Sequence, residues 1–156
     1  MQLDAKNITI GGDAATSALS TLRIIGSSDG ASTPVLNVSS EWLAVTFAGQ
    51  IIGDATSETP HAARLHLTIQ TYFSNMGTIS VNGKDSTTKG QAGGMGGSIY
   101  VDTPRMFGSG NLHALSGCSS ALVCNQVHGI VSLRCWSGHR NWKGVVLNTW
   151  ISNGNH

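Results

Sequence analysis

The residues best suited to chemistry are three cysteines and a histidine near the end of the chain. Cys118, Cys124, Cys135 and His139 follow the spacing C-x5-C-x10-C-x3-H. Three thiolates and one imidazole could hold a zinc ion in a tetrahedral site. The final pair suits a zinc knuckle, but the other spacings match no established pattern, so we assign no metal site. The alternatives are small buried thiols beside a surface histidine, or a Cys118–Cys124 disulfide if the protein is secreted.

The acidic residues form no catalytic pair. Enzymes that cleave polysaccharides need carboxylates and a base gathered on one face, whereas most acids here lie in polar loops. Asp102 follows the apolar stretch 99–101, and Arg105 lies three residues after it. We place Gln70 at the position of the preceding repeat that is equivalent to Asp102. We interpret Asp102 and Arg105 as an exposed, solvated pair and assign no catalytic residue.

The glycine cluster 90–97 could suggest a phosphate-binding loop. Such a loop needs Gly-Lys-Ser/Thr opening a helix, or a strand-turn-helix unit. Here the glycines lead into Ile99-Tyr100-Val101, which alternates as a strand does. We therefore assign no cofactor site, and we expect His61, His66 and His113 to be ordinary surface histidines.

Composition limits the class of protein. The chain has 156 residues, a net charge of +1, 11% charged and 40% hydrophobic residues, 20 glycines and three prolines. A net charge of +1 provides no basic face for binding nucleic acid. The hydrophobic content is too high for an intrinsically disordered chain. No apolar run approaches the ~18–20 residues that cross a bilayer. The start, MQLDAKNITI, lacks the features of a signal peptide. We thus expect either a cytoplasmic protein or a piece of a longer one.

Short alternating triplets recur along the chain. They are Ile8-Thr9-Ile10, Leu36-Asn37-Val38, Leu67-Thr68-Ile69, Ile99-Tyr100-Val101 and Val131-Ser132-Leu133. The intervals between their first residues are 28, 31, 32 and 32. A second apolar element follows each triplet, beginning at Leu22, Gly49, Gly77, Gly110 and Gly144. Variable polar loops separate the units, which is typical of a solenoid.

The triplets predict which side chains face the core. With a period of two, Leu36, Val38, Leu67, Ile69, Ile99 and Val101 point inward, and Thr9 and Thr68 share an outward position. One triplet buries two side chains at roughly 1.5–3 kcal/mol each. Ordering one residue's backbone costs about 1–2 kcal/mol, so a unit is stable only between neighbours. We predict an all-β fold: a single parallel β-solenoid (right-handed β-helix) of about five coils, with almost no helix.

The stretches GGMGGSIYV and GSGNLHA, within 93–117, resemble the glycine-rich right-handed parallel β-helix repeats of large secreted and surface proteins. Residues 77–101 and 110–117 fit that pattern well, and residues 8–76 fit loosely. The resemblance implies an extracellular or cell-surface setting and an adhesin-like role. Phage tailspikes and autotransporter passengers carry such repeats. The pectin-lyase-like polysaccharide enzymes share the coil but not this loop pattern.

The composition changes after residue 117. We assign residues 1–117 to the solenoid coils and residues 118–156 to a divergent terminal coil or cap, or alternatively to a non-native tail. This segment holds all three cysteines and the tryptophans Trp136, Trp142 and Trp150. We expect these tryptophans to cover the last coil, and the first coil to present an open edge. We also expect the long loop 82–97 to project from the coils and to tolerate shortening.

These observations favour a non-catalytic structural or adhesive segment of a larger surface protein. The alternative is a carbohydrate-active β-helix fragment, which binds or cleaves glycans. A tryptophan or tyrosine beside a carboxylate in one groove would favour the alternative. We expect neighbouring coils, a second copy or glycans as partners, and neither nucleic acid nor membrane insertion.

Overall fold

The computed structural model of the chain describes residues 1–11, 19–25, 32–57, 60–119, 129–143, 145–147 and 151–154. Strands joined by turns and loops make up these ranges, and none of their residues is helical. The strands are β1 (Gln2–Ile10), β2 (Ser20–Arg23), β3 (Val35–Val45), β4 (Gly49–Ile52), β5 (Arg64–Asn75), β6 (Thr78–Ser80), β7 (Ser98–Gly108), β8 (Asn111–His113), β9 (Ile130–Trp142), β10 (Val145–Leu147) and β11 (Ile151–Gly154).

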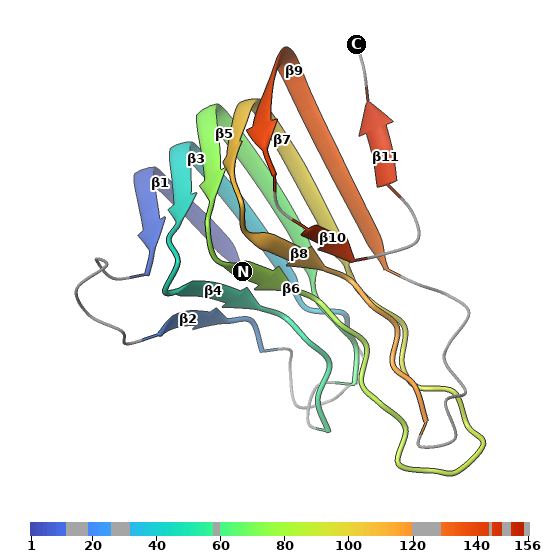
Figure 1. Ribbon diagram of the computed structural model, residues 1–156. Helices are drawn as coiled ribbons and strands as arrows, with labels where there is room; N and C mark the ends of the chain where they lie inside the picture. The colour runs from blue at the N-terminus through green and yellow to red at the C-terminus, as the bar shows by residue number, and fades with distance from the viewer. Residues whose placement is uncertain are drawn as a thin grey trace.

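The strands stack into two parallel sheets (Figure 1). One sheet has the order β1-β3-β5-β7-β9-β11, and the other has the order β10-β8-β6-β4-β2. Successive strands alternate between the sheets, so β1 to β10 form five strand pairs along one axis. Every strand pairing is parallel, which confirms the predicted all-β parallel solenoid.

The long strands bend partway along their length (Figure 1). The pairing register shifts near the middle of β3, β5, β7 and β9, between Ser40 and Trp42 in the first of these. The larger sheet therefore wraps two sides of the solenoid, and the sheet of short strands closes the third. We call the side before the bend the first face and the side after it the second face.

The core is a set of aligned apolar columns. In register, Leu36, Leu65, Ile99 and Val131 lie on successive strands, and all four are fully buried. The six residues predicted to point inward are all buried, at 3% exposure or less. The predicted faces are confirmed.

The predicted alignment of two triplets is wrong. Leu36 and Ile99 pair with Leu65 rather than with Leu67, and Ile8 pairs with Leu43. The alternation of β5 begins at Leu65, two residues before the triplet chosen from the sequence. Because side chains repeat every two residues, a slip of two leaves each residue on its predicted face.

The observed register also corrects two predicted outward positions. Thr68, not Gln70, lies opposite Asp102 on the neighbouring strand. Thr9 pairs with Ala44, so it does not share a column with Thr68, whose partner on β3 is Ser39.

Glycines mark the corner that precedes the short strands. A Cβ at Gly77 would overlap the carbonyl oxygen of Gly49, and a Cβ at Gly110 would meet that of Gly77. Adjacent coils thus approach too closely here for any side chain. Asn75 is fully buried beside them, and its Oδ1 accepts a hydrogen bond from the amide of Gly77 at 3.2 Å.

The repeat continues beyond residue 117. Val131 and Leu133 pair with Ile99 and Val101, and β10 pairs with β8. Both sheets are therefore extended by the segment that we expected to diverge. The side chains of Trp142 and Trp150 lie outside the described residues, and the boundary at 117 stays a prediction.

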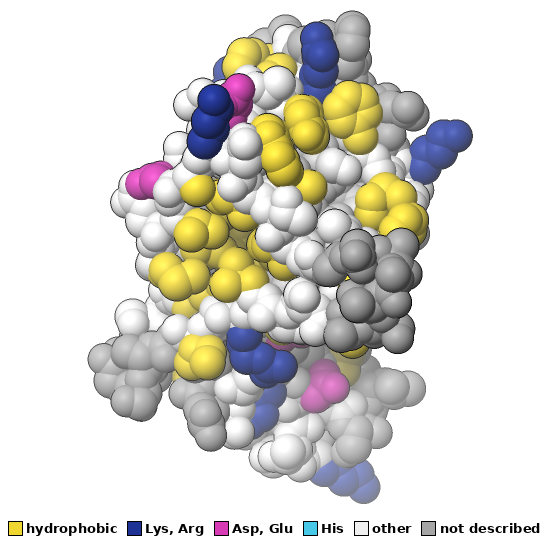
Figure 2. Space-filling model, turned by 90° about the vertical axis from the view of Figure 1, so that its left-hand side faces the viewer, with side chains coloured by type: hydrophobic (Ala, Val, Ile, Leu, Met, Phe, Trp, Pro, Cys, Tyr) yellow, Lys and Arg dark blue, Asp and Glu magenta, His cyan; other side chains and the backbone are white. Residues whose placement is uncertain are grey.

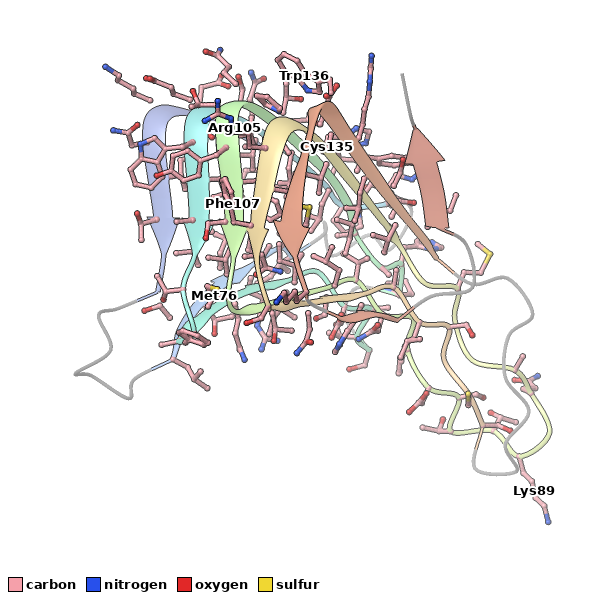
Figure 3. The ribbon with its side chains drawn as sticks, turned by 45° about the horizontal axis from the view of Figure 1, so that its top comes forward. Met76, Lys89, Arg105, Phe107, Cys135 and Trp136 are labelled. Carbon is pink, nitrogen blue, oxygen red and sulfur yellow. The ribbon has the colours of Figure 1, made fainter. Side chains whose placement is uncertain are left out.

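The loop 82–97 projects from the coils, as expected, with Lys89 near its tip (Figures 1 and 3). Both of its ends are nevertheless bonded to a neighbouring segment. The amide of Gly83 donates to the carbonyl of Leu115, and the carbonyl of Gly94 accepts a hydrogen bond from the amide of Gly117. The expectation that the whole loop can be replaced is therefore revised, and only its tip stands clear.

The first coil leaves part of its apolar interior open. Leu3, Ile10 and Leu22 pack on the core but are only partly buried. Figure 2 shows hydrophobic side chains gathered across the end of the molecule that carries β1 and β2.

Candidate functional site

The strongest candidate is a hollow where three long strands bend. It has a volume of about 270 Å³ and is lined by Thr68, Ile69, Gln70, Asp102, Arg134 and Trp136. We call it the bend groove. It combines an aromatic ring with an acid, a base, an amide and a hydroxyl.

Strand register brings the polar residues together. Thr68 on β5, Asp102 on β7 and Arg134 on β9 occupy one outward column of the first face. Their neighbours Val101 and Leu133 are buried, so the alternation of the strands directs the polar side chains outward.

A bulge places Trp136. Cys135 pairs with Thr103 and His139 pairs with Arg105, so three residues of β9 lie opposite the single residue Pro104 of β7. Trp136 is the first of those three, and it is 54% exposed at the bend (Figure 3). Bulges commonly re-aim a side chain beside a functional site. The expectation that Trp136 covers the last coil is wrong, because it lines the bend groove instead.

Cys135 anchors this bulge to the neighbouring strand. Its Sγ donates a hydrogen bond to the carbonyl of Pro104 at 3.1 Å, and the thiol is buried. The residue before Trp136 is thus fixed on the core side while Trp136 itself faces solvent.

The groove contains one ion pair. Nη1 of Arg134 lies 3.6 Å from Oδ2 of Asp102, with the two side chains 56% and 44% exposed. The predicted pairing of Asp102 with Arg105 is therefore wrong. Such an exposed pair contributes little stability, roughly 0–1 kcal/mol. Both groups can still reach a ligand, as hydrogen-bond acceptor and donor respectively.

The mixture of groups suits a sugar. One face of a pyranose ring is made of C–H groups that can pack on an indole ring, and its edge carries hydroxyls that need donors and acceptors together. Trp136 supplies the flat apolar surface, and Asp102 and Arg134 supply the polar pair. Binding sites commonly combine apolar lining with a few such polar groups.

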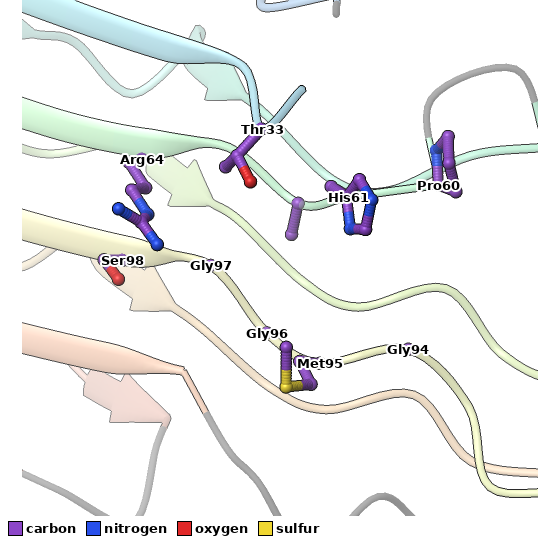
Figure 4. A pocket seen from close by; sticks show the side chains of 10 residues that line it. Thr33, Pro60, His61, Arg64, Gly94, Met95, Gly96, Gly97 and Ser98 are labelled. Atoms are coloured by element: carbon purple, nitrogen blue, oxygen red, sulfur yellow. The ribbon is translucent and has the colours of Figure 1, made fainter. Parts of the chain in front are cut away.

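A second hollow of about 320 Å³ lies between the segment 60–64 and the glycine cluster (Figure 4). Glycine backbone and small side chains form much of its wall, and among its described lining residues Arg64 is the one from the Lys, Arg, Asp and Glu group. The glycines continue into β7 at Ser98, so they open no helix that could hold a phosphate. We do not take this hollow as the functional site.

A disulfide removes Cys118 from the zinc site considered from the sequence. Cys118 is disulfide-bonded, and Cys135 is a buried free thiol. Cys124 and the side chain of His139 lie outside the described residues. No group of metal ligands occurs among the residues that the structure describes.

Several loop acids and amides bind neighbouring coils rather than ligands. Oδ1 of Asp54 accepts a hydrogen bond from the amide of Asn82 at 2.6 Å. Oδ1 of Asn82 accepts one from Leu115 at 2.9 Å, and Oδ1 of Asp85 accepts one from Cys118 at 2.8 Å. These side chains extend the coil-to-coil hydrogen bonding into the loops, a role that the sequence did not reveal.

Aromatic residues also stack between coils on both faces. On the second face, Trp42 stacks on Tyr72 at 5.8 Å between ring centroids, and Phe107 meets Tyr72 edge-on. On the first face, Tyr100 lies 4.9 Å from the ring of His66. These contacts could not be predicted from the sequence, because they depend on the register between strands about thirty residues apart.

No family model, curated protein or solved structure shows significant similarity to the chain. The resemblance to glycine-rich β-helix repeats therefore stays a prediction. Within the described ranges, no helix is long and apolar enough to span a membrane. The function must be inferred from the fold and the bend groove.

Proposed function

We propose that the chain is a structural and adhesive β-solenoid segment of a larger extracellular or cell-surface protein, without catalytic activity of its own. Coils stacked in register form a stiff scaffold, and side chains on its outer faces are held by strand geometry. A rigid outer face is a good platform for recognition, because little conformational freedom is lost when a ligand binds.

The bend groove is the observation that carries this proposal. Trp136 is held outward by a bulge and lies beside the Asp102–Arg134 pair. The exposed indole ring offers a flat apolar surface on which a sugar ring can pack.

The disulfide at Cys118 supports the extracellular setting. Disulfides persist in oxidising compartments and are rare in the cytosol of most organisms. The free thiol of Cys135 is compatible with that setting because it is buried.

The second candidate is a carbohydrate-active enzyme, and Trp136 beside Asp102 also favours it. Glycoside hydrolases generally use two carboxylates about 5–10 Å apart. Among the residues that the structure describes, Asp102 is the one carboxylate that lines the groove. We therefore favour binding without cleavage, with glycans as the ligand and neighbouring coils or a second copy as further partners.

A glycan array tests the proposal. The chain should bind a subset of glycans, and Trp136→Ala should lose that binding. Phe47→Ala is the matched control, because Phe47 is an exposed aromatic residue in the turn between β3 and β4, 74% exposed and away from the groove. Binding by no glycan, or full binding by Trp136→Ala, would overturn the proposal. Release of shortened glycans would favour the enzyme instead.

A further inference from the structure

We propose that the bend groove is one end of a longer site for a neutral oligosaccharide, which continues along the first face to Tyr100. This inference rests on the proposed glycan adhesion. Tyr100 would be a second stacking platform, with the Asp102–Arg134 pair between it and Trp136.

Tyr100 and Asp102 share the outer surface of β7. They are two residues apart, which is about 6.6 Å along a strand. Ile99 and Val101 on either side of Tyr100 are buried, so its ring faces outward. Pro104, which lies opposite the bulge of Trp136, is a further two residues along the strand.

Along the first face the site therefore runs from the ring of Tyr100, through the Asp102–Arg134 pair, to the ring of Trp136. From Tyr100 to the bend the strand covers about 13 Å. That length exceeds one hexose ring, so a single sugar cannot touch both platforms. A chain of several sugars lying along β7 can.

Tyr100 is held in place by a ring on the neighbouring strand. His66 on β5 pairs with Tyr100 in register, and the two rings are tilted by 31° at 4.9 Å between centroids. This contact restricts the tyrosine ring before any ligand arrives, which lowers the entropy lost on binding.

The charges favour a neutral ligand. Asp102 and Arg134 compensate each other, so the centre of the site has no net charge. Adjacent hydroxyls of a sugar can donate to the carboxylate and accept from the guanidinium. Thr68 and Gln70 add a hydroxyl and an amide at the same place.

A peptide fits this surface less well. Extended peptides are commonly bound by adding a strand to an open sheet edge. The residues of β7 along the site pair with β5 on one side and β9 on the other. Recognition here has to use side chains, which suits a saccharide.

Calorimetric titration with neutral oligosaccharides tests the inference. Cello-, manno- and xylo-oligosaccharides, from mono- to hexasaccharide, serve as probes. Affinity should rise with length by about tenfold or more and then level off once both platforms are covered. Tyr100→Ala should remove that gain while leaving monosaccharide binding unchanged, and Trp136→Ala should abolish binding at every length.

Three further variants separate binding from folding. Tyr100→Phe keeps the ring and should bind like the unmodified protein, whereas Tyr100→Leu keeps apolar bulk without the flat ring and should behave like Tyr100→Ala. Tyr72→Ala, which removes the same side chain from the second face, should leave binding unchanged.

The outcomes distinguish this inference from the proposed function. Binding that depends on Trp136 but not on length, or not on Tyr100, overturns the longer site and leaves glycan adhesion standing. The absence of binding by every probe here and on the array overturns both.

Discussion

Replacing Ile99 with alanine tests the stacked core most sharply. Ile99 is fully buried in β7, in register with Leu65 on one side and Val131 on the other. Truncating a buried isoleucine to alanine costs about 2–5 kcal/mol, depending on how well the site can collapse. Here the strands on both sides are fixed by parallel pairing, so the cavity cannot close. We expect a loss of about 3–5 kcal/mol, in the upper part of that range.

Urea unfolding followed by circular dichroism measures this loss. Domains of this size are stable by only about 5–15 kcal/mol, so the midpoint should fall strongly. Asn37→Ala is the control, because Asn37 lies in an exposed outward position of β3. It should change stability by less than about 0.5 kcal/mol. If Ile99→Ala is no more damaging than Asn37→Ala, the columns described above do not form the core.

Four further results are expected. Ser40→Ala should raise stability by about 1 kcal/mol in thermal unfolding, because Ser40 Oγ is buried with no hydrogen-bond partner among the described residues; a loss would show a missed contact. Asn75→Ala should lower the stability by about 1–3 kcal/mol in the same measurement, since its hydrogen bonds to Gly77 and Asn111 at the corner disappear. Unchanged stability would contradict the role of Asn75 at the corner. Deleting residues 87–90 should leave the yield of soluble protein unchanged, whereas deleting 83–96 should abolish it; equal yields would refute the loop's packing. In sedimentation the chain should self-associate through its open first coil, and Leu22→Lys should restore the monomer; a monomeric unmodified chain would count against the open edge.

The sequence was sufficient to predict the parallel solenoid and the buried face of β3, β5 and β7. Alternating triplets at nearly constant intervals admit few other structures. The register was less certain for a physical reason. Leu65 and Leu67 both point inward, and a slip of two residues leaves the inward pattern unchanged. Only the pairing of whole strands selects Leu65 as the partner of Ile99.

The bend groove could not be predicted from the sequence. Asp102 and Arg134 meet only when β7 and β9 pair in the correct register, and Arg105 seemed the nearer partner. Trp136 depends on a bulge, and nothing in the local sequence shows that three residues of β9 lie opposite Pro104. The combination expected of a glycan site, a tryptophan or tyrosine beside a carboxylate, does occur in the bend groove, where Trp136 and Asp102 both line the hollow.

The indole N–H signal of Trp136 gives the most direct test of the central claim, that the bend groove binds a neutral glycan. In a nitrogen-15 spectrum it can be assigned with Trp136→Phe, and the signal of Trp42 on the second face is an internal control. Titration with an oligosaccharide selected on the array should shift the Trp136 signal saturably and leave that of Trp42 in place. An unmoved Trp136 signal, while the glycan still binds, would contradict the claim.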